Sequence, residues 1–267
     1  MVTQMSNKFQ ALARTGYAAR GVVYILLGSL ALTSAFVGGE ATDSSSAMSS
    51  LLQLPFGRIL LALIAAGLGG HILWRLAQGF LDADNVGTDA KAIVRRLGSL
   101  VSGAANLFLA LTAGRMSIGQ SGGAEGGGEE KASAWLLQQP FGGLLLGIVA
   151  VLVIVAGAVQ ILKALTRKYR DRMKFDSSHG WLDSVCSFGL IARGTLIVIM
   201  GGFTGHGAIT FSPERAGGMS DTLDYVRSLP LGPWLYGLAA IGLVAFGGYS
   251  IIQARYRHIN VTAVGKS

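Results

Sequence analysis

Ionisable side chains are rare inside the long apolar stretches of this sequence. His71 and Arg75 are the sharpest pair, because they lie four residues apart and so share one face of a helix. Asn106 and Gln160 are polar residues that we expect nearby. If the apolar stretches are membrane helices, these four residues predict a pocket for a lipid headgroup or another anion on the inner side. Hydrogen bonding between helices, with Arg75 reaching out to the membrane surface, is the competing interpretation and the one we favour.

The remaining reactive side chains predict no further site. The four histidines are expected at different depths, with His71 towards the inner side, His206 at an outer end, and His179 and His258 outside the apolar stretches. No cysteine or carboxylate cluster has the spacing of zinc ligands, and no nucleophile has an obvious base. We therefore expect no catalytic residue, no metal and no cofactor, and a protein that is not an enzyme.

The composition indicates elements that cross a membrane. Of the 267 residues 51% are hydrophobic and only 13% are charged, against roughly 25% charged residues in globular chains. Residues 141–162 and 231–254 are uncharged runs, each long enough to span the roughly 30 Å of a bilayer's hydrocarbon core. Four shorter runs lie at residues 21–37, 59–74, 97–114 and 194–211. We expect an all-α polytopic membrane protein with six transmembrane helices.

The formal net charge of +8 is sorted by side of the membrane. Lysine and arginine gather near both termini and in the segments after the second and fourth runs. The other side holds only Arg58, Arg115, Lys131, Arg215 and Arg227. The positive-inside rule then predicts an inner (plasma) membrane location of bacterial type, with both termini in the cytoplasm. Since topology explains the basic residues, we expect no nucleic-acid partner. Membrane lipids, anionic ones among them, and a partner protein are the expected binders.

A repeated segment organises the six runs. Residues 16–28 return in degraded form around Gly103 and Gly194, and residues 51–57 return around Pro140 and Pro230. We expect one membrane domain, residues 1–267, made of repeats at 12–81, 94–166 and 185–256. Because each repeat has two spans, successive repeats have the same orientation and predict a pseudo-threefold arrangement. Each repeated proline is expected in the first turn of a second helix, and a short interfacial helix at residues 46–52.

Small residues recur every seven positions in the first helix of each repeat and predict its packing face. The positions that we assign to helix packing are Gly21, Gly28, Gly103, Ala110, Gly194 and Gly201. Small residues let membrane helices approach closely, which is what holds such helices together in lipid. We therefore expect the three first helices at the packed centre, each covered by the second helix that follows it.

Arg20 and Arg193 stand at equivalent places in the first and third repeats, where we expect the cytoplasmic entrances of helices. The segment Gly-Tyr-Ala-Ala-Arg-Gly at residues 16–21, with Ala-Arg-Gly at 192–194, resembles the bacterial membrane family of domain of unknown function 1206. The resemblance implies a triplicated two-helix membrane module and no assigned activity. The second repeat departs from the pattern with Ser102 in place of arginine, which argues against a role for three equivalent arginines.

Two kinds of function fit these patterns. The first is an integral membrane bundle of structural, lipid-binding or partner-binding type, without covalent chemistry. The alternative is a small channel or carrier for an ion or small solute along the pseudo-threefold axis. A conducting path needs a polar lining in all repeats, whereas the rows of small residues are apolar, so we rank transport second.

Overall fold

The computed structural model describes residues 2–37, 44–53, 55–82, 87, 89–120, 128–170 and 180–256. Within these ranges the regular elements are helical and none is a strand. The elements are α1 (Val2–Val37), α2 (Ser44–Leu52), α3 (Gly57–Phe80), α4 (Ala90–Ser117), α5 (Gly128–Leu137), α6 (Gly142–Leu165), α7 (Gly180–Thr210), η2 (Pro213–Arg215), α8 (Met219–Ser228) and α9 (Gly232–Tyr256).

Each repeat contributes a long helix, a short helix and a second long helix. The first helices are α1, α4 and α7, the second helices are α3, α6 and α9, and the short helices α2, α5 and α8 lie between them. The short helix predicted at residues 46–52 corresponds to α2, and the other two repeats carry a short helix as well. Among the described residues, five helices are long and apolar enough to cross a membrane: α3, α6, α7, α9 and residues Arg14–Ala35 of α1.

A tight turn joins each short helix to the second long helix. Phe56, Phe141 and Leu231 take left-handed backbone angles there, with φ of 64°, 60° and 63°. In each turn a glycine follows, and a Cβ on it would collide with a carbonyl oxygen of the preceding short helix. The repeated prolines lie one residue before these left-handed positions and therefore in the turn, not in the first helical turn as we expected.

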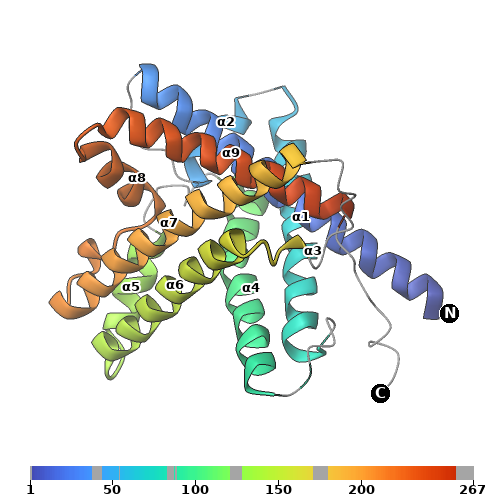
Figure 1. Ribbon diagram of the computed structural model, residues 1–267, viewed down its shortest axis with the longest axis horizontal. Coiled ribbons are helices and arrows are strands. Elements are labelled where there is room, and N and C mark those ends of the chain that lie inside the picture. Colours follow the sequence, from blue (N-terminus) through green and yellow to red (C-terminus); the bar gives the residue numbers. More distant parts are fainter. Residues whose placement is uncertain are drawn as a thin grey trace.

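The long helices pack in three close pairs: α1 with α9, α3 with α4, and α6 with α7 (Figure 1). Each first helix thus packs most extensively on a second helix from another repeat, not on its own as we expected. Over the described residues the three first helices do not pack extensively on one another, so they do not form the packed centre that we expected. Within repeats, α1 also packs on α3 and α7 on α9, whereas α4 and α6 do not pack together over the described residues.

Glycine rows explain this pairing physically. In α1 and α9, a Cβ on Gly21 would lie 2.8 Å from the carbonyl oxygen of Gly247. In α7 and α6, a Cβ on Gly194 would lie 2.9 Å from the carbonyl oxygen of Gly157. These two crossings leave no room for side chains, and such close backbone contact is the main attraction between helices in lipid.

The third crossing is looser. A Cβ on Gly103 of α4 would lie 3.2 Å from the Cβ of Arg75 and 4.0 Å from the carbonyl oxygen of Ile72. Ile72, Gly157 and Gly247 each stand 17 positions after a repeated proline, so the three crossings occupy equivalent places in the repeats. Among the other predicted packing positions, Gly28 and Gly201 are buried and Ala110 is partly buried.

Candidate functional site

Two arginines from different repeats meet in the middle of the bundle. The guanidinium carbon of Arg20 on α1 lies 4.8 Å from the ring centre of Phe246, and that of Arg193 on α7 lies 4.6 Å from the same ring. Both groups also lie over the ring of Tyr24, at 5.8 and 5.1 Å. The Tyr24 and Phe246 rings pack edge to face, 4.8 Å apart. The four residues form what we call the arginine site.

Every hydrogen-bond partner of these arginines that the structure places is a neutral oxygen. Arg193 donates from Nε to the Tyr24 hydroxyl at 3.0 Å and from Nη1 to Oε1 of Gln160 at 2.8 Å. Arg20 also reaches the Tyr24 hydroxyl. However, the Nε of Arg20 is buried without a hydrogen-bond partner, and the residue as a whole is only 8% exposed. A donor on a buried cation is thus left unsatisfied.

The carboxylate groups of the described residues do not pair with Arg20 or Arg193. Over the described ranges the ion pairs join Asp183 to Arg167 and to Arg170, and neither Arg20 nor Arg193 takes part. A buried charge is normally paired, because removing it from water is expensive. The arginine site therefore carries positive charge that this part of the protein does not neutralise.

A second polar group lies on α3. Arg75 donates from Nε to Nε2 of His71 at 3.4 Å and from Nη1 to Oε1 of Gln78 at 3.0 Å. His71 is fully buried, 5.0 Å from the ring of Tyr17. Over the described ranges no three His, Cys, Asp or Glu side chains gather to hold a metal ion.

The two polar groups adjoin each other. Arg75 and Arg193 are both near enough to Arg20 to repel its charge. Arg75 also lies at the crossing of α3 with α4, beside Gly103 and therefore beside Ser102. Each of the three close helix pairs thus supplies one arginine. In the pair of α3 and α4 this arginine is Arg75 on α3, whereas α4 carries Ser102. The first helix of the second repeat still lacks the arginine that Arg20 and Arg193 supply in the other repeats, and the cation at this crossing comes from α3 instead.

The four residues of the predicted pocket do not share hydrogen bonds as one group. Gln160 hydrogen-bonds to Arg193, not to Arg75. Asn106 is buried but donates to the carbonyl oxygen of Ser102 in its own helix, at 2.7 Å. Sequence reasoning missed Tyr24 and Phe246, although Phe246 aligns with His71 when positions are counted from the repeated prolines. An aromatic residue in an apolar run carries no signal that separates it from ordinary core.

The repeat arginines do not stand at helix entrances as we expected. α1 begins at Val2 and α7 at Gly180, so Arg20 and Arg193 lie well inside these helices. The neighbouring crossings stand about 12 Å before the ends of α3, α6 and α9, at 1.5 Å of rise per residue. With so little exposure, Arg20 does not extend to a membrane surface.

Basic residues after α6 form a latch to the start of α7. Arg170 donates from Nε to Asp183 at 2.6 Å, and Arg167 lies 3.6 Å from the same carboxylate. The Tyr169 hydroxyl bonds to Asp183 and, at 2.8 Å, to Ser187. Burial raises the pKa of Tyr169 to about 12, and the bond to Asp183 acts in the same direction. Arg167 and Arg170 thus have a protein partner in Asp183.

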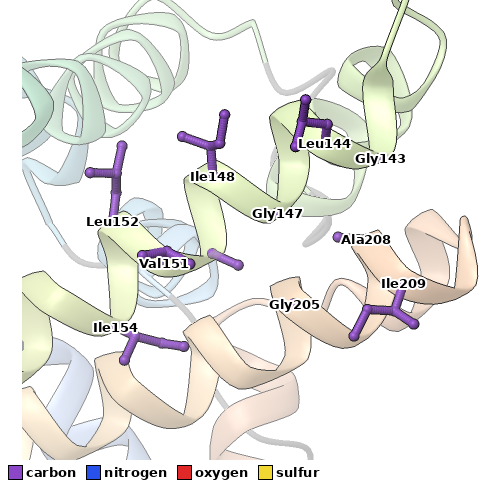
Figure 2. A pocket seen from close by; sticks show the side chains of 11 residues that line it. Gly143, Leu144, Gly147, Ile148, Val151, Leu152, Ile154, Gly205, Ala208 and Ile209 are labelled. Atoms are coloured by element: carbon purple, nitrogen blue, oxygen red, sulfur yellow. The ribbon is translucent and has the colours of Figure 1, made fainter.

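An open apolar groove of about 590 Å³ runs between α6 and α7 (Figure 2). Gly147 and Gly205 stand on its two sides and leave it wide because they carry no side chain. Gln160 lies 13 residues after Gly147, which is about 140° around the helix. The groove and the arginine site are therefore on different faces of α6. Of the remaining histidines, His206 is exposed near the end of α7, and His179 and His258 lie outside the described residues.

These features define a membrane protein built from bundled helices. The family described as Domain of Unknown Function (DUF1206) matches the chain in three segments, at residues 15–82, 97–167 and 188–257. The chain belongs to this family. It is 33% identical over 252 residues to "Uncharacterized protein YxxB" of Bacillus subtilis (strain 168), covering 92% of this chain and 90% of that relative. No solved structure matches the chain.

Proposed function

We propose that this protein is a six-span bundle of the plasma membrane that carries out no covalent chemistry and binds an anionic membrane component at the arginine site. The observation that carries the proposal is the pair formed by the buried Arg20 and the partly buried Arg193, whose placed partners are all neutral. The partner class is the one that the sequence predicts, a lipid headgroup or similar anion, but the residues that hold it are centred on Arg20 rather than on His71.

The energetics favour a bound anion. An arginine at the centre of a membrane helix costs about 2.5–3.5 kcal/mol on insertion scales. A desolvated contact with an aromatic face offsets about 2 kcal/mol or more. The rings of Tyr24 and Phe246 therefore lower the cost of two cations without removing the net charge. An oxyanion supplies both the charge and the acceptor that Arg20 Nε lacks, and guanidinium groups bind phosphate oxygens in pairs.

Separate observations support the number of six spans and the orientation of the protein in the membrane. α4 has 28 residues and packs along α3, which favours it as the sixth span beside the five apolar helices. The three equivalent crossings support a pseudo-threefold arrangement of the repeats. The basic segments follow α3, α6 and α9, so the positive-inside rule puts those ends, and the nearby arginine site, on the cytoplasmic side.

The glycine rows favour a bundle over the alternative channel or carrier. A Cβ on Gly28 would lie 2.7 Å from the carbonyl oxygen of Ala240, and a Cβ on Gly201 would lie 3.1 Å from the backbone nitrogen of Ile154. These positions are occupied by helix contacts. A partner protein remains the second class of binder for the exposed apolar surface of α6, which is the least buried of the five apolar helices.

Native mass spectrometry of the purified protein tests the proposal. With phosphatidylglycerol and phosphatidylcholine at equal concentration, we expect selective retention of phosphatidylglycerol. The double variant Arg20→Gln, Arg193→Gln is expected to lose this selectivity at least tenfold, because it removes the buried charges. Arg215→Gln is the matched control, since Arg215 is exposed and outside the site. Equal retention of both lipids by the unaltered protein, or full selectivity in the double variant, would refute anion binding at this site.

A further inference from the structure

The second repeat breaks the packing rule that the other two follow. Within the first repeat α1 packs on α3, and within the third α7 packs on α9. α4 and α6 do not pack extensively on each other over the described residues. The bundle is therefore an open series, α4–α3–α1–α9–α7–α6, whose two ends leave a seam between α4 and α6.

Exposure at the arginine site follows this seam. Arg20, on the central helix α1, is 8% exposed. Arg193 and Gln160 on the α6 and α7 pair, and Arg75 on the α3 and α4 pair, are partly exposed. The partly exposed residues Arg75, Arg193 and Gln160 thus belong to the two helix pairs that flank the seam. The buried Arg20 lies on α1, between these pairs in the series. The exposed edge of the arginine site therefore lies with these two helix pairs.

The stripe of α6 that carries Gln160 is otherwise apolar. Ala156 and Val149 lie four and eleven residues before Gln160, so the three share one stripe of the helix. Both Ala156 and Val149 are exposed. An anion bound at Arg193 and Gln160 therefore has an apolar surface leading away from it on the same face. A ligand that matches both parts has a phosphate-type head and an apolar tail.

From these observations we infer that the arginine site admits a phospholipid laterally through the seam between α4 and α6, with its phosphate at Arg20 and Arg193 and an acyl chain along the Ala156 stripe. This inference rests on the proposed anion binding and specifies the ligand and its route. The oxyanion chemistry is shared with free phosphate esters. A phospholipid differs from a free phosphate ester in that it has an apolar tail and approaches the site from the bilayer.

A bulky side chain in the seam tests the route. Ala156→Trp places a large ring on the stripe one turn from Gln160, where the small native side chain is exposed. Gly147→Trp is the matched control on the same helix, because a Cβ there meets nothing within 4 Å and it faces the apolar groove instead. Val149→Trp is a second seam variant that decides the matter if Ala156→Trp does not fold.

The measurement is native mass spectrometry with phosphatidylglycerol and with glycerol phosphate as separate probes. We expect phosphatidylglycerol to bind at least tenfold more tightly than glycerol phosphate, Ala156→Trp to lose at least tenfold in lipid binding, and Gly147→Trp to bind normally. Wild-type lipid binding by both seam variants, or equal binding of glycerol phosphate, overturns the lateral route while leaving the anion site. Absence of binding by either probe to the unaltered protein overturns the anion site itself.

Discussion

At the level of single residues, the arginine site depends on two aromatic rings that hold two cations together. Tyr24 and Phe246 come from α1 and α9, so their edge-to-face contact also joins the first repeat to the third. Arg193 donates to Tyr24 from the third repeat. These contacts place groups from distant parts of the sequence at one point, and each supports the position of the others. Rigid placement of this kind is what a binding site in a dry environment requires.

The glycines at the helix crossings give a sharp prediction about stability. Gly157→Ala would put a Cβ 2.7 Å from the carbonyl oxygen of Gly194, which the backbone cannot avoid without separating α6 from α7. We expect a loss of about 1–3 kcal/mol, the usual cost of overpacking, measured by thermal unfolding in detergent. Gly147→Ala on the same helix meets nothing within 4 Å and serves as the control. Equal melting temperatures for the two variants would show that the crossing is not tight.

At the level of elements, the latch between α6 and α7 predicts a dependence on alkaline pH. The folded protein raises the pKa of Tyr169 from 10.0 to about 12, so it holds this proton more tightly than the unfolded chain does. The stability that the hydroxyl contributes is therefore complete below pH 10 and is lost as the pH rises towards 12. A hydrogen bond to a charged group contributes about 1.5–3 kcal/mol. We expect Tyr169→Phe to unfold at a lower temperature than the unaltered protein at neutral pH.

The comparison of the two proteins across pH is the decisive measurement. The difference in melting temperature between Tyr169→Phe and the unaltered protein should shrink between pH 10 and pH 12, because ionisation breaks the same bond that the substitution removes. Effects of other titrating groups act on both proteins and cancel in the difference. A difference that stays constant through this range would contradict the role of the Tyr169 hydroxyl.

Part of the element arrangement was readable from the sequence. The three repeats and the small-residue rows follow from residue spacing, since a seven-residue period keeps Gly21 and Gly28 on one face of a helix. The identity of the partner helix did not follow, because a row of glycines says that something approaches closely without saying what. Tyr24 and Phe246 were hidden for a related reason: their role comes from the arginines that tertiary packing brings to them.

At the level of the whole molecule, the proposed pseudo-threefold arrangement predicts that the third arginine can be moved. Arg75 and Ser102 lie at the same crossing on opposite helices. We expect Arg75→Ser to weaken retention of phosphatidylglycerol severalfold, and Arg75→Ser combined with Ser102→Arg to restore part of it, because the cation returns from the other helix. Retention is measured by native mass spectrometry, as for the arginine site.

Ser102→Arg alone is the control for this exchange, since it adds a cation without replacing one. If the double variant binds no better than Arg75→Ser, then the position of Arg75 on α3 matters in itself and the three crossings are not interchangeable. His71 and Gln78, which accept hydrogen bonds from Arg75, make a full restoration unexpected.

The pairing of each first helix with a second helix from another repeat also bears on the order in which the protein is made. Among the described helices α1 comes first in the chain, and its most extensive partner, α9, comes last. Until α9 is inserted, Gly21 and Gly28 face lipid or a helper protein in place of the helix that fits them. The earliest of these helices is thus the last to gain its full packing, and a chain that stops before Gly232 has α3 but not α9 to pack against α1.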